Sequence, residues 1–204
     1  MSIRAAHVVP CTEAEGPGRR FAIWFQGCPL RCPGCCNPEM LRFEGGIEIK
    51  IVDLLAQIDS AVERDGVEGI TLLGGEPFAH AAAAASVAEA VKQRGLTVMI
   101  FSGYTLSELR GRKDAVTERL LSNTDILVDG PYLRDLPETQ RRWIGSKNQI
   151  VHFLSDRYSE NDPVWLQPNT LELRLDLTGL TVNGFPAAES KSFWQRTPTK
   201  PSPK

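Results

Sequence analysis

The sequence lacks several features that would point to whole classes of protein. It has no run of about eighteen apolar residues, so no membrane-spanning helix is expected. The first residues, Met1 to His7, lack the apolar core of a signal peptide. The net charge of −2 gives no basic excess of the kind that nucleic-acid binding needs. Neither G-x-G-x-x-G nor G-x-x-x-x-G-K-[ST] occurs, which disfavours dinucleotide and P-loop sites. We therefore expect one 204-residue globular protein without a membrane or nucleic-acid partner.

Cysteine is also scarce, and four of the five cysteines lie in one loop. Cys28, Cys32 and Cys35 have the spacing C-x3-C-x2-C, and Cys36 follows at once. Pro29, Pro33, Gly34 and Pro38 disfavour a helix there and bend the backbone, so that the sulfurs can converge. Thiolates gathered in this way bind iron–sulfur clusters or zinc. Because the chain lacks the apolar core of a signal peptide, it is expected in the cytoplasm, where thiols stay reduced. Reduced thiols fit cluster ligation, and Cys11 is interpreted as a free cysteine.

The spacing favours an iron–sulfur cluster over zinc. Structural zinc usually takes four ligands, commonly as two separated pairs. Cys36 is a poor fourth ligand, because adjacent side chains on an extended backbone point apart. Three ligands on a four-iron cluster leave one iron open, and an open metal site indicates chemistry. A structural zinc knot is the alternative interpretation.

Apolar runs alternate with helical patterns along most of the chain. Strands are expected at 21–25, 67–73, 97–101, 125–129 and 149–153, and helices at 51–65, 79–94, from 105 and at 113–121. This alternation predicts an α/β fold with a mostly parallel sheet and right-handed crossovers. The polar motifs follow the carboxyl ends of the strands, where such sheets bind ligands. After residue 156 the pattern changes, and 171–182 predicts a β-hairpin.

An ordered set of short motifs resembles a known family across residues 8–155. The chain is similar to radical S-adenosylmethionine (SAM) enzymes, and in particular to the activating proteins of anaerobic ribonucleoside-triphosphate reductase. The motifs, besides the cysteine loop, are Gly16-Pro17-Gly18-Arg19, Gly74-Gly75-Glu76-Pro77, Ser102-Gly103-Tyr104, Asp129-Gly130-Pro131 and Gly145-Ser146-Lys147-Asn148-Gln149. The resemblance implies a partial (βα) barrel of radical SAM type over 1–156. A C-terminal β extension over 157–188 and a disordered tail over 189–204 would follow.

The resemblance also implies the cofactors, a [4Fe-4S] cluster and SAM, and the residues that bind them. Cys28, Cys32 and Cys35 would ligate three irons, leaving the fourth to chelate SAM. Glu76 would accept a hydrogen bond from the ammonium group of SAM. Cys36 stands where the family usually has an aromatic residue near the adenine. The residues expected to bind SAM are Gly34, Cys36, Gly74, Gly75, Glu76, Ser102, Asp129, Ser146 and Asn148.

The implied activity is that of a glycyl-radical-enzyme activase. It would cleave SAM reductively and use the 5′-deoxyadenosyl radical to install a glycyl radical on a partner such as anaerobic ribonucleotide reductase. No second cysteine cluster is present, so a flavodoxin or ferredoxin would supply the electron. Two alternatives stay open. One is a radical SAM enzyme that modifies another peptide or a small molecule, and the other is a non-catalytic iron–sulfur or zinc protein that binds a partner.

Overall fold

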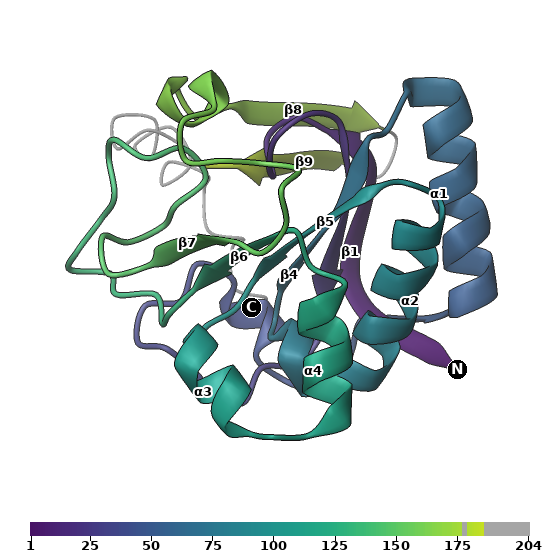
Figure 1. Ribbon diagram of the computed structural model, residues 1–204. Coiled ribbons are helices and arrows are strands. Elements are labelled where there is room, and N and C mark those ends of the chain that lie inside the picture. Colours follow the sequence, from purple (N-terminus) through teal and green to yellow (C-terminus); the bar gives the residue numbers. More distant parts are fainter. Residues whose placement is uncertain (177–178, 186–204) are drawn as a thin grey trace, which may run out of the picture.

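The computed structural model describes residues 1–176 and 179–185, which form a mixed α/β sheet and a separate β-hairpin (Figure 1). The larger sheet has seven strands in the order β3-β1-β2-β4-β5-β6-β7, and β8 pairs with β9. The predicted tail at 189–204 lies outside the described residues. With 3-10 helices labelled η, the elements are β1 (Ser2–Thr12), β2 (Arg20–Phe25), η1 (Pro38–Met40), β3 (Ile47–Lys50), α1 (Ile51–Asp65), β4 (Gly69–Gly74), η2 (Pro77–His80), α2 (Ala81–Gln93), β5 (Thr97–Phe101), α3 (Leu106–Gly111), α4 (Ala115–Ser122), β6 (Ile126–Asp129), β7 (Ile150–Phe153), η3 (Pro163–Leu166), β8 (Leu171–Asp176) and β9 (Gly179–Gly184).

Parallel pairing is confined to the centre of the large sheet. Strands β2, β4, β5 and β6 pair in parallel, as the alternating pattern predicts. Strands β1 and β3 pair antiparallel on one side. On the other side β7 pairs antiparallel with β6, so the strand predicted at 149–153 exists but has the opposite direction to the one expected. The reason is the connection between them, residues 130–149, which holds no helix that could carry the chain back for a parallel crossover.

The two faces of the sheet are covered differently. Phe21 and Ile23 of β2 point to one face, where they pack with Leu54 and Ile58 of α1 and with the alanine-rich side of α2. Figure 1 shows the helices gathered on that side. The other face packs against Trp143 and Ile144, which come from the loop between β6 and β7. Central strands buried on both faces explain their continuously apolar sequences.

Local signals set the helix boundaries. Helix α1 ends at Gly66, which has the left-handed conformation with φ 66° and donates to the carbonyl of Val62. Helix α3 begins at a capping box in which Thr105 and Glu108 satisfy each other's backbone N–H groups. Both features are confirmed predictions. The predicted helix at 79–94 starts later, because Pro77 opens the 3-10 turn η2 before α2.

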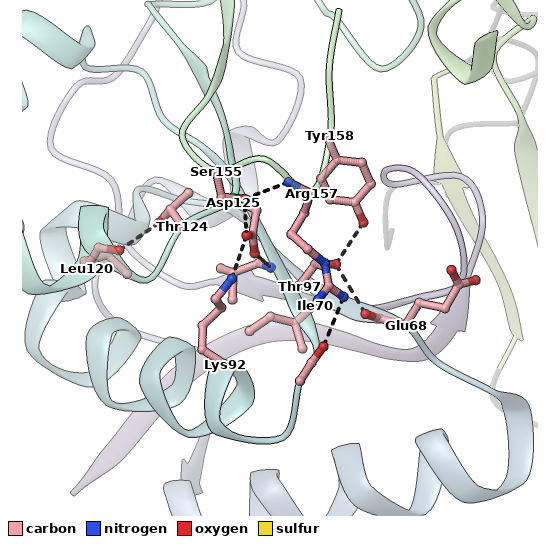
Figure 2. Close-up of polar contacts among 12 residues, drawn as sticks. Glu68, Ile70, Lys92, Thr97, Leu120, Thr124, Asp125, Ser155, Arg157 and Tyr158 are labelled. Carbon is pink, nitrogen blue, oxygen red and sulfur yellow. Dashed lines mark hydrogen bonds and ion pairs between the residues drawn. The ribbon is translucent and has the colours of Figure 1, made fainter. Parts of the chain in front are cut away.

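A polar network lies at the amino ends of the parallel strands (Figure 2). The buried Asp125 accepts from Lys92 at 2.6 Å, from Ser155 at 2.5 Å and from the backbone N–H of Val98 at 2.8 Å. The fully buried guanidinium of Arg20 donates to the hydroxyls of Thr71 and Thr97. These bonds join β2, β4, β5 and the segment after β7 at the strand ends opposite the cysteine loop. The polar residues at this end therefore stabilise the fold.

The β8–β9 hairpin docks on the end of β1 and the loop that follows it. Asn183 donates to the Thr12 hydroxyl at 2.9 Å, and the N–H of Gly184 donates to the buried Glu15 carboxylate at 2.7 Å. Burial raises the pKa of Glu15 to about 7, although hydrogen bonding by Gly184 and the Asn183 side chain lowers it. The predicted hairpin is therefore present and is anchored to the core. No helix within the described residues is both long and apolar enough to cross a bilayer.

The raised pKa of Glu15 predicts a pH-dependent stability. The folded protein holds a proton on this carboxyl between about pH 4.5 and about pH 7, where the unfolded chain has lost it. The free energy of unfolding should therefore fall as pH rises through that window, by on the order of 3 kcal/mol from this group. Urea unfolding of the wild type and Glu15→Gln across this range should show a shallower decline in the variant. Parallel profiles would contradict the assignment.

Candidate functional site

The cysteine loop begins directly after β2 and is closed at its base by backbone bonds. The N–H of Gly27 donates to the carbonyl of Met40 at 2.9 Å, and the N–H of Cys28 donates to that of Leu41 at 3.2 Å. Inside the loop, Cys35 N–H donates to the Cys32 carbonyl at 3.1 Å, which makes a turn between these two thiols. The loop is therefore closed at its base and carries four sulfurs at the carboxyl end of β2.

Gly74 and Gly75 let the end of β4 approach the base of this loop. The N–H of Gly75 donates to the Phe25 carbonyl at 2.8 Å, and that of Glu76 donates to the Gly27 carbonyl at 3.0 Å. A Cβ at Gly74 would lie 2.7 Å from the Cα of Trp24, and one at Gly75 would lie 2.4 Å from the Gly27 carbonyl oxygen. Two glycines are thus required by backbone packing, and the same packing leaves their backbone beside the cysteines.

Glu76 joins the ends of β4 and β5. One carboxylate oxygen accepts from the N–H of Phe78 at 2.9 Å and from the Ser102 hydroxyl at 3.0 Å, and the other accepts from the N–H of Gly103 at 2.9 Å. Burial raises the pKa of Glu76 to about 7 in spite of these three donors. The side chain is 1% exposed and holds Ser102 and Gly103 in place.

A cavity opens between the cysteine loop and the carboxyl ends of the parallel strands. Its volume is about 170 Å³, and its mouth is open to solvent. It collects eight of the twelve residues predicted to bind the cluster or SAM. These are Cys28, Cys32, Cys35, Cys36, Gly74, Gly75, Glu76 and Ser102.

The other four predicted residues, Gly34, Asp129, Ser146 and Asn148, are not among those that line the cavity. Gly34 lies against Arg134, whose Cδ would be 2.7 Å from an added Cβ. The buried Asp129 carboxylate accepts from the N–H of Leu106 at 2.5 Å and lies 2.9 Å from Nε2 of His152. It therefore connects β6 with the start of α3 and with β7.

Ser146 and Asn148 hold the loop that borders the cavity. The buried Ser146 hydroxyl accepts from the N–H of Leu133 at 3.1 Å. The side-chain amide of Asn148 donates to the Pro131 carbonyl at 2.7 Å, whereas its Oδ1 is buried with no hydrogen-bond partner among the described residues. A buried acceptor without a partner is uncommon in folded proteins.

Several cavity residues were not predicted as site residues. Gln149 accepts from the N–H groups of Gly145 and Ser146, both at 3.1 Å, and donates to the Gly130 carbonyl at 3.2 Å. Its place at the end of the Gly-Ser-Lys-Asn-Gln motif was a usable signal. Phe101 precedes Ser102 at the end of β5 and could have been found in the same way. Phe185, which belongs to the C-terminal hairpin segment, carries no local signal of a site.

Tyr132 is a further unpredicted cavity residue, and it interacts with Cys36. Burial and a hydrogen bond with the Cys36 thiol raise the pKa of Tyr132 to about 12. Tyr132 therefore stays a neutral phenol at physiological pH. Cys36 is exposed and turned toward this phenol, whereas Cys28 is buried. The structure thus gives Cys36 a hydrogen-bonding neighbour from outside the cysteine loop.

The three remaining thiols suit an iron–sulfur cluster. Burial raises the pKa of the Cys28 and Cys35 thiols, and backbone N–H groups partly offset this. One such bond, from Asn37 to the Cys35 sulfur, measures 3.4 Å. Donors of this kind stabilise cluster sulfur, and bound metal drives deprotonation. Over residues 1–176 and 179–185, no three His, Cys, Asp or Glu side chains, the loop cysteines included, are gathered as they would be around one metal ion.

Comparison with known proteins identifies the class of this site. Residues 14–152 match the family model of a 4Fe-4S single cluster domain. That span covers the cysteine loop, the Gly-Gly-Glu segment and the strands that carry them. The chain is therefore an iron–sulfur protein of the single-cluster class.

Full-length relatives narrow the class to one family. The anaerobic ribonucleoside-triphosphate reductase-activating protein of Escherichia coli K12 is 31% identical over 156 residues, which cover 71% of this chain and 95% of that protein. The Vibrio cholerae protein of the same name is 32% identical, covering 70% and 93%, and the phage T4 protein is 26% identical, covering 78% and 95%. The chain belongs to the family of anaerobic ribonucleoside-triphosphate reductase-activating proteins. It is accordingly a radical SAM enzyme whose cofactors are a [4Fe-4S] cluster and SAM.

One solved structure, that of QueE from Escherichia coli, also matches part of the chain. It covers 52% of this chain and 54% of that chain at 20% identity, with a TM-score of 0.38. This likeness is too weak to bear on the function.

The loop geometry predicts which cysteines hold the cluster. Cys28→Ala, Cys32→Ala and Cys35→Ala should each lose the reconstituted cluster, because each removes one of three ligands. Cys36→Ala should keep it, since that thiol is turned to Tyr132. Iron content and visible absorption after anaerobic reconstitution would measure this, with Cys11→Ala as a control outside the loop. Cluster loss in Cys36→Ala would refute the assignment.

The three bonds to Glu76 predict a second outcome. Glu76→Ala leaves the N–H groups of Phe78 and Gly103 and the Ser102 hydroxyl without their acceptor. The free energy of unfolding should fall by about 2 kcal/mol or more. Binding of SAM should weaken while the visible absorption of the cluster stays intact. Equilibrium dialysis with the cluster-loaded variant would measure the SAM affinity, and an unchanged affinity would contradict a role at the SAM site.

Proposed function

We propose that this protein installs a glycyl radical on an anaerobic ribonucleotide reductase, using a radical made from SAM. The observation that carries the proposal is the cavity in which three cysteines of one loop meet the Gly74-Gly75 backbone. The match to this chain covers nearly the whole length of the relatives that are named for activating the anaerobic reductase, which supports the same role here.

In this proposal Cys28, Cys32 and Cys35 ligate three irons of the cluster. The bound cluster supplies the electron that cleaves SAM into methionine and a 5′-deoxyadenosyl radical. The chain's own residues position the reactants. The closed base of the loop fixes where the thiols lie, and Cys28 is buried.

The remaining predicted residues are proposed to hold SAM directly or through the backbone. Gly74 and Gly75 present backbone groups beside the cysteine loop, where the amino-acid end of SAM would lie. Glu76 supplies negative charge for the ammonium group while it fixes Ser102. The unpaired Oδ1 of Asn148 suits a ribose hydroxyl.

The other proposed contacts are less direct. The thiol of Cys36 and the backbone of Gly34 are proposed to border the nucleoside. Asp129 and Ser146 are proposed to act by holding the surrounding loops, because both are buried and already hydrogen-bonded.

A protein substrate needs an open approach to the site. We propose that the parallel strands form part of a partial (βα) barrel over residues 1–156 whose open side admits the glycine-bearing segment of the reductase. The electron would come from a flavodoxin or ferredoxin, because the sequence has no second cysteine cluster to relay it. The cytoplasm is the proposed setting, since these thiols must stay reduced.

One observation favours a second candidate. The hairpin at 171–184 lies beyond the residues that match the family model, yet its last segment reaches the cavity through Phe185. A radical SAM enzyme that modifies a different peptide or a small molecule would use such an addition to select its substrate.

The two candidates predict different partners for the radical. The cluster-loaded protein, reduced with dithionite and given SAM, should produce 5′-deoxyadenosine under both. Incubation with an anaerobic ribonucleotide reductase should yield a glycyl radical signal in electron paramagnetic resonance, and replacing the accepting glycine of the reductase by alanine should remove it. Formation of 5′-deoxyadenosine without any glycyl radical would favour the second candidate. Absence of both products would overturn the proposed function.

A further inference from the structure

The C-terminal hairpin contributes a residue to the cavity although it lies outside the family domain. The matching family model ends at residue 152, and β9 ends at Gly184. The next residue, Phe185, lines the same cavity as Cys28 and Gly75. A side chain more than thirty residues beyond the matched region thus completes the wall of the site.

The backbone that leads into Phe185 is held in place. Gly184 has φ 108°, and its N–H donates to the buried Glu15 carboxylate at 2.7 Å. A Cβ there would lie 2.2 Å from the carbonyl oxygen of Thr170, so only glycine fits. The N–H of Phe185 itself donates to that Thr170 carbonyl at 3.3 Å. The ring is therefore delivered to the cavity by a fixed segment.

The ring of Phe185 packs on Phe101, and together they form an aromatic wall. The two ring centroids are 6.0 Å apart and the rings are inclined by 31°. Phe101 ends β5 directly before Ser102, whose hydroxyl donates to Glu76. The aromatic wall therefore lies next to the polar part of the cavity, which is formed by Gly74, Gly75 and Glu76.

We propose that Phe185 is a positioning residue that packs against the adenine ring of bound SAM. This inference rests on the proposed function. The amino-acid end of SAM carries an ammonium, a carboxylate and a sulfonium group, which need polar or metal partners. The adenine is the planar, apolar-faced part of the molecule, and it is the part that an aromatic wall can stack on.

Replacing the Phe185 ring should weaken binding of ligands that contain the nucleoside and leave methionine binding unchanged. In the cluster-loaded protein, Phe185→Ala should bind S-adenosylhomocysteine and 5′-deoxyadenosine about tenfold more weakly, the usual size for one base–aromatic stack. Binding of methionine should stay within a factor of two. Phe185→Trp should retain the affinity, and Phe185→Leu should lose it, because leucine keeps the apolar bulk without the planar face. Isothermal titration calorimetry under anaerobic conditions would measure all of these.

The control separates this inference from the proposed function. Leu175→Ala changes an apolar side chain on the same hairpin that is 82% exposed, so it should bind like the wild type. If the wild type binds none of these ligands, the proposed function fails. If the wild type binds them and Phe185→Ala binds equally well, only the role of Phe185 is overturned. An equal loss of methionine and nucleoside binding would also overturn it, because it would indicate general collapse of the cavity.

A second variant tests delivery of the ring by the hairpin. Glu15→Ala removes the acceptor for Gly184 and should weaken nucleoside binding about threefold, with the Phe185 ring still present. Glu15→Gln keeps an acceptor oxygen and should restore the affinity. Equal binding by Glu15→Ala and wild type would show that the ring needs no anchor at Gly184 and would overturn this part of the inference.

Discussion

The site depends on the close backbone contact between the ends of two neighbouring parallel strands, β2 and β4. Two hydrogen bonds, from Gly75 to Phe25 and from Glu76 to Gly27, join the start of the cysteine loop to the segment after β4. The contact is possible only because positions 74 and 75 have no Cβ. It places the thiols and the backbone that would face SAM at one sheet edge, where α/β proteins bind their ligands.

Polar groups at the amino ends and at the carboxyl ends of the parallel strands have different roles. At the amino ends of the strands, Arg20 and Asp125 have their hydrogen-bonding capacity taken up by neighbouring side chains and backbone. At the carboxyl ends, the thiols of the cysteine loop and the Gly74–Gly75 segment line the cavity. The polar groups at the amino ends of the strands thus stabilise the fold, whereas those at the carboxyl ends form the candidate site.

Much of this arrangement was predictable from residue patterns. Apolar runs predicted the central strands, the thiol spacing indicated the cluster, and the capping box and Gly66 set helix ends. The antiparallel direction of β7 was missed, although the sequence has no helical pattern between residues 130 and 149 that could carry a parallel crossover. Gly34 and Asp129 lie in recognisable motifs, but their surroundings depend on the distant residues Arg134 and His152. Phe185 could not be found, since nothing near it in the sequence resembles a site.

The anchoring of the hairpin on the first strand sets an order of assembly. Asn183 and Thr12 are 171 residues apart in the chain, and Gly184 and Glu15 are 169 apart. Contacts between such distant residues form late, because the whole intervening chain must first be available. During synthesis the thiol-bearing loop and its supporting strands leave the ribosome long before the hairpin does. The residues of the metal-binding loop are therefore synthesised well before Phe185, which completes the aromatic wall of the same cavity.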